Sequence, residues 1–522
     1  MSPVTRFGHH PNPLREALKW DSHLCKKLID FSCIIGNSIA NIFFWKNLEA
    51  MVFSSPAFIF LFLPLFLLIY SIVPKYCKNA AILFCSLFFY ALGPGARIDI
   101  LAFYILFNWA VGLIIAKTRG RIAFIYAFTA IFVNVCGLIY YKYMDFIIYS
   151  FLELSGHHTD THPHSLEIGF IPLGISFFSF QAISYVIDVY RGAVPASRSL
   201  IEFATFKAFF PQLIAGPIVR YVEIKTELSA RRFTIDNIFE GLFRFSTGLA
   251  MKTMIADPLS SVATQILQTD QAHLTTSLAW IAMLSYSFQI YFDFAGYSSM
   301  AIGIARITGF HFPENFDRPY SSRSITEFWR RWHMTLSRWF RDYIYIPLGG
   351  NRAGRLRTLM NLVVVFALCG LWHGAAVQFL VWGLYHGALL CIERVTGWDK
   401  SSNSFAVVVL RTLSTFLLVV IGWVFFRAET LGQAMHILSL MSGLAPEGVP
   451  FRTEWFYLTG DKVAVLVVAT AFSMIRMSQL WPTQRLGGWS VALQGAASLA
   501  LLVLSASAIA VGGFSPFIYF QF

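Results

Sequence analysis

Two histidines stand out because each lies where an ionisable side chain needs an explanation. His333 lies in TEFWRRWHMTLSRWF, and His373 lies in GLWHGA near the middle of the apolar run 358–391. An ionisable residue at membrane depth is costly unless it is paired or hydrated, so it is a candidate for function. Two histidines in a low-dielectric cavity suit general base catalysis on a hydroxyl group, with direct acyl transfer from a bound donor. A packing role for His373 is the alternative that the sequence leaves open.

Signatures of other reaction classes are missing from the sequence. There is no GxSxG elbow, no P-loop, no HExxH helix and no CxxC pair, so a covalent nucleophile is not evident. We expect no metal site and no disulfide framework, because the seven cysteines are scattered and most lie in apolar runs: Cys25, Cys33, Cys77, Cys85, Cys136, Cys369 and Cys391.

Further polar residues lie close to the histidines in sequence. Asp293, in QIYFDFAG, is either a structural partner for an arginine or a tyrosine hydroxyl, or part of a binding site. The segment 311–320 (HFPENFDRPY) contains two prolines and cannot be continuous helix. Broken backbone at membrane depth is tolerated where it is buried in protein or lines a cavity. Asn315 and Arg318 are therefore candidate substrate-binding residues, together with Asp293.

An amphipathic helix is predicted to carry His333. The spacing of Ser324 and Glu327 is that of a capping box, which predicts a helix that begins there and runs on through His333. Its apolar face is aromatic, and its basic face holds Arg330, Arg331, Arg338 and Arg341. Such a helix suits the membrane interface. Interfacial anchoring does not explain a histidine on the less basic flank.

The amino-acid composition indicates whether water or lipid surrounds these residues. The chain has 522 residues, of which 56% are hydrophobic and 13% charged, with a mean hydropathy of +0.60. Soluble domains carry roughly 25% charged residues, so lipid must surround much of this protein. The net charge of +12 comes from short basic clusters between apolar runs, as in cytoplasmic loops. We therefore expect no nucleic-acid partner.

The apolar runs predict an all-α, multi-pass membrane domain with about ten to fourteen embedded helices, some of them re-entrant. We find them at 55–74, 80–93, 98–117, 122–152, 167–187, 203–219, 237–256, 278–305, 358–391, 405–427, 463–477 and 490–512. Two loops on one side of the membrane carry five basic residues, which places that side in the cytoplasm: Lys75, Lys78, Lys117, Arg119 and Arg121.

The first fifty residues do not fit this orientation. They would be translocated, yet they carry six basic residues and no continuous apolar stretch. We expect 1–50 to be an extension that a mis-assigned start adds, with Met51 as the natural start and 51–522 as one membrane domain. Intact-mass measurement of the native protein tests this, and an N-terminus at residue 1 or 2 contradicts it.

The segments that carry the two histidines resemble a known family. The segment ENFDRPYSSRSITEFWRRWHMTLSRWFRDYIYIPLGGNR, followed by GLWHGA, resembles the membrane-bound O-acyltransferase family, and within it the bacterial alginate O-acetyltransferase branch. Supporting blocks are IPLGISFFSFQAISYVIDVYRG at 171–192, FFPQLIAGPIVRY at 209–221, GWVFFRAET at 422–430 and the C-terminal FIYFQF. The similarity runs from about Met51 to Phe522.

The resemblance implies helices around a central tunnel and an activity. Members take an acyl group from a cytoplasmic thioester, here expected to be acetyl-CoA, and deliver it to a hydroxyl beyond the bacterial inner membrane. The branch works with a periplasmic partner protein that acetylates an exopolysaccharide such as alginate. By motif match His373 is the embedded catalytic histidine, and His333 is the second one, nearer the cytoplasm. Arg330 and Arg331 would then attract the phosphates of the donor, although anchoring to lipid headgroups explains them equally well.

Two other classes of protein remain as alternatives. A transporter also contains broken helices and embedded polar groups, and a non-catalytic scaffold of a polysaccharide export complex would need neither. The polar groups concentrate between 291 and 373 and do not recur in both halves of the chain. This distribution favours a single reaction centre.

Overall fold

The structure, a computed structural model, describes residues 51–155, 171–352, 354–398, 404–450, 452–476, 488–512 and 515–518. Within these ranges all regular secondary structure is helical, which confirms the predicted all-α class. The expected extension 1–50 lies outside the described residues, so the boundary at Met51 stays a prediction. The chain divides into two compact units, of which Val52–Phe522 is the larger and contains both histidines.

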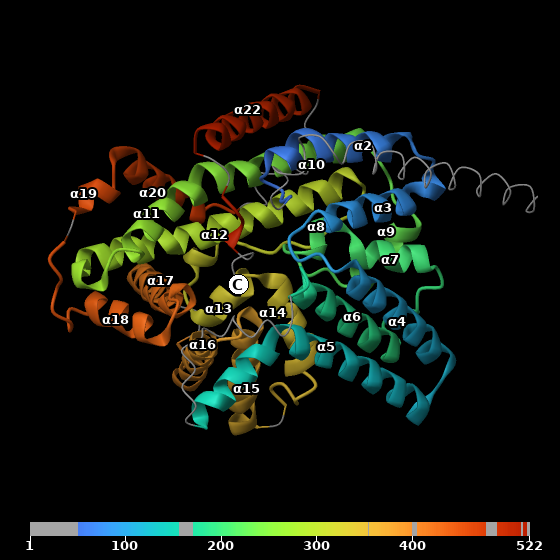
Figure 1. Cartoon of the computed structure of the whole chain (residues 1–522), viewed down its shortest axis with the longest axis horizontal. Helices are drawn as coiled ribbons and strands as arrows, with labels where there is room; N and C mark the ends of the chain where they lie inside the picture. The colour runs from blue at the N-terminus through green and yellow to red at the C-terminus, as the bar shows by residue number, and fades with distance from the viewer. Residues whose placement is uncertain are drawn as a thin grey trace, which may run out of the picture. The chain divides into compact units, whose positions relative to one another are not determined.

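Helices follow one another along the whole of this larger unit (Figure 1). Those before residue 270 are α2 (Leu63–Ile72), α3 (Lys78–Ala91), α4 (Ile98–Lys117), α5 (Gly120–Leu154), α6 (Ile175–Tyr190), α7 (Leu200–Ala208), α8 (Phe210–Leu213), α9 (Tyr221–Ser229), α10 (Ile235–Ala250) and α11 (Asp257–Leu267). Those after it are α12 (Thr276–Ile307), α13 (Ile325–Arg331), α14 (Met334–Phe340), α15 (Arg355–His373), α16 (Val377–Thr396), α17 (Phe405–Arg427), α18 (Leu431–Met441), α19 (Glu454–Tyr457), α20 (Gly460–Ser473) and α22 (Gly488–Gly512).

Five of these helices are long and apolar enough to cross a membrane by length and composition, among the residues that the structure describes: α4, α5, α15, α17 and α22. Their bounds agree with the predicted runs at 98–117 and 405–427. Other expected runs are interrupted. The run 203–219 becomes α7 and the short α8, because the chain bends at Phe209 and Pro211 follows. Helices α12 and α16 are long enough to span but less apolar than these five, whereas α2, α3, α6, α10 and α20 are shorter than a full span.

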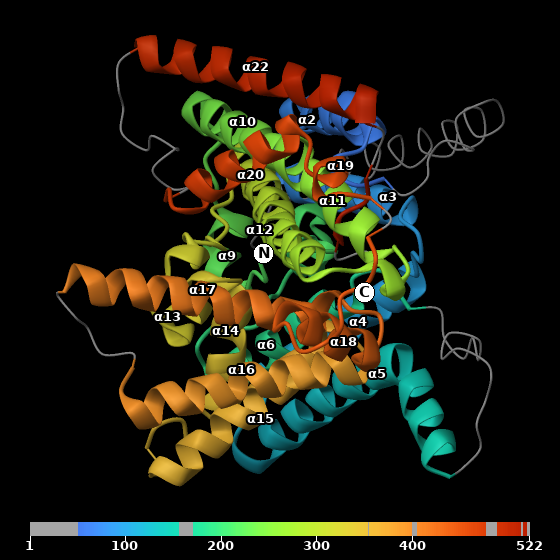
Figure 2. The ribbon, with the colours of Figure 1, turned by 90° about the vertical axis from the view of Figure 1, so that its left-hand side faces the viewer.

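Helix α12 lies between α10 and α17 in both views (Figures 1 and 2). It meets α10 backbone to backbone, because a Cβ atom on Gly248 would lie 2.5 Å from the carbonyl oxygen of Gly296, and one on Gly303 would lie 2.6 Å from that of Gly241. Such close approach requires glycine. The contact fixes the helix that carries Asp293.

Candidate active site

The helix expected to run through His333 is broken at that residue. Helix α13 ends at Arg331, α14 begins at Met334, and His333 between them is left-handed, with φ 40° and ψ 55°. The prediction of one continuous helix is wrong because Asn315 caps a new one. Its carbonyl oxygen accepts from the Met334 N–H (2.9 Å), and its side-chain oxygen accepts from the Thr335 N–H (3.3 Å). A left-handed non-glycine residue costs about 1–3 kcal/mol, and such residues cluster at functional sites.

The start of α13 is as predicted, with one addition. The hydroxyl of Ser324 accepts from the Glu327 N–H at 3.0 Å, which confirms the cap. The carboxylate of Glu393, buried on α16, accepts from the Ile325 and Thr326 N–H groups at 2.5 and 2.9 Å. A carboxylate at a helix N-terminus is stabilising. Glu393 therefore fixes α13, the helix before His333, to α16, the helix after His373.

Asn315 also fixes the tautomer of His333. The imidazole Nδ1 lies 3.0 Å from Asn315 Oδ1, an oxygen that also accepts from the Thr335 hydroxyl at 2.8 Å, while the amide nitrogen donates to Ser298 Oγ at 3.1 Å. Because an amide oxygen only accepts, Nδ1 carries the proton and donates it. The lone pair is then on Nε2, which makes no hydrogen bond to any residue that the structure describes. Nε2 is an available proton acceptor in a fully buried ring.

His373 lies at the end of a helix rather than near the middle of one. The apolar run 358–391 is a helical hairpin in which α15 ends at His373 and α16 begins at Val377. The prediction of one segment is therefore wrong. A Cβ atom on Gly374 would lie 2.1 Å from the Phe379 ring, and one on Gly370 would lie 2.2 Å from the Phe379 carbonyl oxygen. The two glycines thus permit the close approach of α16.

Trp372 brings the two histidines into one cluster. Its ring centroid lies 4.8 Å from that of His373 and 6.2 Å from that of His333. Trp382 and Phe426 each lie 5.1 Å from His373, and Phe294 lies 4.7 Å from His333. His373 is 5% exposed. The surroundings are thus aromatic and nearly dry, and the cavity and tunnel expected from the sequence stay predictions.

Asp293 belongs to a buried ion-pair cluster next to this site. Its Oδ1 lies 3.1 Å from Lys252 Nζ, which also lies 2.6 Å from Asp257 Oδ1. Its Oδ2 accepts from the Ile518 N–H at 2.8 Å. The partner is thus a lysine rather than the expected arginine or tyrosine. Its role in substrate binding stays a prediction, since all these contacts are structural.

The cluster holds Phe517 and Ile518 against the aromatic residues that pack on His333. Phe517 stacks on Tyr297 with centroids 4.6 Å apart and also packs on Phe294 at 5.7 Å. Phe294 in turn meets the ring of His333 edge-on. Asp293 therefore influences His333 indirectly, because it holds the segment of Phe517 and Ile518, and Phe517 packs on the Phe294 ring beside His333.

Asp293→Asn should lower the stability of the fold and have little effect on the acyl-transfer reaction. The substitution removes one of two carboxylates on the buried Lys252 while keeping an acceptor for Ile518. Breaking a buried pair completely costs about 3–5 kcal/mol, so we expect a smaller loss here, seen as a melting temperature several degrees lower in detergent. The KM for donor should stay within about twofold. An unchanged melting temperature with a raised KM would instead establish the substrate-binding role.

The predicted basic residues are mostly paired. Arg331 pairs with Glu327 and donates to the hydroxyl of Ser321 at 2.8 Å, and Arg318 lies 3.2 Å from Asp317. Arg330 is exposed on α13. Pairing neutralises much of the charge that would attract donor phosphates, so Arg330 is the best placed for that role. The role itself stays a prediction for Arg318, Arg330 and Arg331.

The end of α14 shows the same pairing. Arg341 lies 2.7 Å from Asp342, and Arg220 lies 2.8 Å from the same carboxylate. Burial alone would raise the pKa of Asp342, but the two arginines outweigh it and the pKa is lowered. Asp342 is thus an anion that holds the basic residues in place.

Comparison with known proteins decides the family. The model of the membrane-bound O-acyltransferase family matches residues 193–426, which include both histidines. A probable alginate O-acetylase of Pseudomonas putida is 41% identical over 494 residues, with 90% of this chain and 100% of that protein covered. The chain belongs to the membrane-bound O-acyltransferase family.

Two other relatives of this membrane-bound O-acyltransferase are named for acceptors other than alginate. The peptidoglycan O-acetyltransferase of Helicobacter pylori is 34% identical over 537 residues, with 93% of this chain and 100% of that protein covered. The teichoic acid D-alanyltransferase of Bacillus subtilis is 29% identical over 318 residues, with 56% and 78% covered. The chain is an O-acyltransferase and a multi-pass membrane protein, as the sequence predicted.

Several residues of this membrane-bound O-acyltransferase site were not found from sequence. Trp382, Phe426 and Glu393 come from α16 and α17, and no local pattern marks them. His386, in GLYHGA, accepts a hydrogen bond from the Trp329 indole at 3.4 Å and is fully buried, which fits a structural role.

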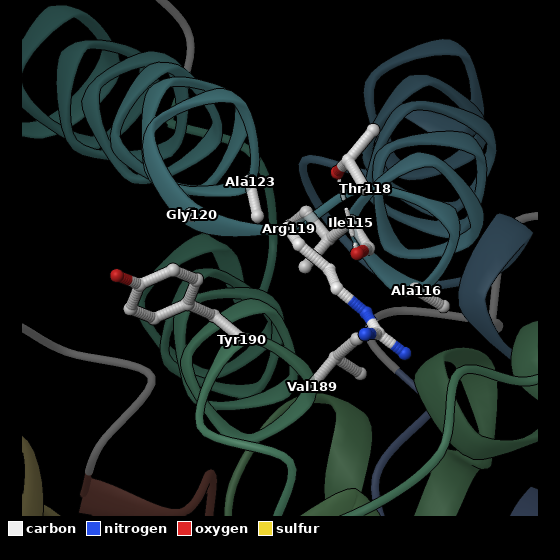
Figure 3. A pocket seen from close by; sticks show the side chains of 8 residues that line it. All are labelled: Ile115, Ala116, Thr118, Arg119, Gly120, Ala123, Val189 and Tyr190. Atoms are coloured by element: carbon white, nitrogen blue, oxygen red, sulfur yellow. Dashed lines mark hydrogen bonds between the residues drawn. The ribbon is translucent and has the colours of Figure 1, made fainter.

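One open pocket of about 470 Å³ lies away from this site, at the turn between α4 and α5 and the end of α6 (Figure 3). Arg119 and Tyr190 are among the residues that line it, and none of the predicted site residues does. The O-acyltransferase site is therefore not this pocket.

Proposed function

We propose that this protein transfers an acetyl group from acetyl-CoA on the cytoplasmic side of the bacterial inner membrane to hydroxyls of an extracytoplasmic polysaccharide such as alginate. A periplasmic acetyltransferase partner would place the group on the polymer. The observation that carries the proposal is the packing of both His333 and His373 against Trp372, in a chain of this family.

The proposed chemistry needs no covalent enzyme intermediate. His373 accepts the proton of the attacking hydroxyl, whose oxygen bonds to the thioester carbonyl carbon. The carbon–sulfur bond then breaks, and the departing thiolate takes the proton from the His373 imidazolium to leave as the thiol. The lone pair on His333 Nε2, which makes no hydrogen bond to a described residue, would stabilise the positive charge that develops on His373. Such base catalysis contributes about 10²–10⁴-fold.

The similarity of relatives supports the acceptor class. The names of the Pseudomonas, Helicobacter and Bacillus proteins all describe acyl transfer to a cell-surface or secreted polymer. Alginate is proposed because, of two relatives that both match along their whole length, the alginate O-acetylase is 41% identical and the peptidoglycan O-acetyltransferase 34%.

Purified protein in liposomes, given labelled acetyl-CoA outside and an alginate oligosaccharide together with the periplasmic acetyltransferase partner inside, tests the proposal. We expect release of the free thiol outside and labelled ester inside, both well above a His373→Gln control. Intact labelled acetyl-CoA inside the liposomes would identify a transporter, and neither product would identify a scaffold. Either of these results contradicts the proposal.

A further inference from the structure

A charged side chain from α5 reaches the end of the helix that carries His373. Lys142 Nζ donates to the carbonyl oxygens of Trp372 at 2.6 Å and of His373 at 3.2 Å. The neighbouring Tyr143 hydroxyl donates to the carbonyl oxygen of Leu371 at 2.7 Å. Figures 1 and 2 both show α5 beside α15.

These bonds complete the end of α15. A helix leaves its last four carbonyl groups without an internal partner. Here the Gly370 carbonyl accepts from the Gly374 N–H at 3.4 Å, and the next three accept from Lys142 and Tyr143. Gly374 is extended, so the turn after His373 does not supply donors of the usual left-handed kind. The donors come from another helix.

Loss of the Lys142 and Tyr143 donors would strongly destabilise the end of α15. Water is scarce at membrane depth, and each unsatisfied backbone group costs several kcal/mol in hydrocarbon. The positive charge also lies at the negative end of the helix dipole. In spanning helices charged residues pair with backbone carbonyls of this kind and mark functional pathways.

The bonds act on the residues that the chemistry needs. The backbone of Trp372 and His373 sets the positions of both side chains, and Trp372 is the ring that touches His333. Lys142 Nζ also lies 5.9 Å from the centroid of the Trp372 ring. A displacement of about 1 Å at a reacting group can cost roughly a hundredfold in rate.

We propose that Lys142 and Tyr143 are positioning residues of the active site, which hold the end of α15 so that Trp372 and His373 stay in register with His333. This inference rests on the proposed function for its expected effect on kcat. Its expected effect on hydrogen exchange at the end of α15 does not depend on that function. Its signal in the sequence is an isolated lysine within the apolar run 122–152.

Two readouts test it on the full chain in nanodiscs, with acetyl-CoA as the donor. Lys142→Met should lower kcat about ten- to a hundredfold with the KM for acetyl-CoA within twofold, and amide hydrogen exchange in the last turn of α15 should become faster. Lys142→Arg, which keeps the donors, should restore kcat to within about threefold of the wild type. Tyr143→Phe should show the same change in exchange and a smaller loss of kcat, and it carries the test if Lys142→Met does not fold.

Lys78→Met is the matched control, because Lys78 also donates to a helix carbonyl, that of Tyr70 at 2.7 Å, away from the histidines. It should leave both readouts unchanged. The inference is overturned if Lys142→Met keeps kcat within twofold, if exchange at the end of α15 does not change, or if Lys78→Met has the same effects. Should the wild type show no His373-dependent turnover, the proposed function fails, while hydrogen exchange still decides whether Lys142 holds the helix.

Discussion

His373→Gln should lower the rate of acetyl transfer by about a thousandfold and leave the fold intact. The reason is that glutamine keeps a polar group of similar reach in the pocket of Trp372, Trp382 and Phe426 but cannot accept a proton near neutral pH. A general base contributes about 10²–10⁴-fold, and its orientation at the end of α15 adds to this. The measurement is single-turnover release of the thiol from acetyl-CoA by protein in nanodiscs.

The second helix of the same hairpin, α16, provides a matched control in His386→Gln. Like His373, His386 is a buried histidine that is followed by a glycine. It accepts a hydrogen bond from Trp329 and has no role in the proposed reaction. We expect this change to lower the melting temperature and to keep kcat within about threefold. Equal losses of activity in both variants would mean that histidine packing, rather than proton transfer, explains the effect.

His333→Gln should cost about a hundredfold in kcat. The variant loses the fixed lone pair on Nε2 that would accept from the charged His373, and the loss is smaller than at His373 because the base itself remains. Removal of a general acid–base partner matters by at least roughly a hundredfold. Turnover within about threefold of the wild type would show that His333 takes no part in the chemistry.

Asn315→Ala provides the test of how His333 works. It removes the oxygen that holds the His333 Nδ1–H and should cost about tenfold in kcat. Because the two residues form one hydrogen-bonded unit, the double variant should be no slower than His333→Gln alone. Additive losses would mean that Asn315 acts on the substrate directly, as the sequence alone had indicated.

The sequence was sufficient for the parts of the fold that depend on local pattern. The runs at 98–117 and 405–427 match α4 and α17, because length and hydropathy determine such helices. His373 was found because ionisable residues are rare in apolar surroundings, and His333 because interfacial anchoring of its helix does not explain a histidine. The break in 311–320 was expected from its prolines, and the structure confirms that this segment is not continuous helix.

The breaks at the histidines could not be read from local pattern, because distant residues cause them. The left-handed turn at His333 depends on Asn315, which precedes it by 18 residues. The end of α15 at His373 depends on Lys142, which is 231 residues away. Lys142 is the one lysine in the apolar run 122–152, but nothing local to it identifies the carbonyl groups that it contacts. Pairing over such separations is a property of the folded chain.

The glycine contacts within the α15–α16 hairpin limit the routes by which molecules reach the catalytic residues. A Cβ atom on Gly383 would lie 2.2 Å from the carbonyl oxygen of Phe366, just as one on Gly370 would from that of Phe379. The two main chains therefore touch along a seam with no side chains between them. No pantetheine arm or sugar can thread through that seam. A substrate must arrive from the other sides of His373, where aromatic side chains, rather than main chain, surround the imidazole.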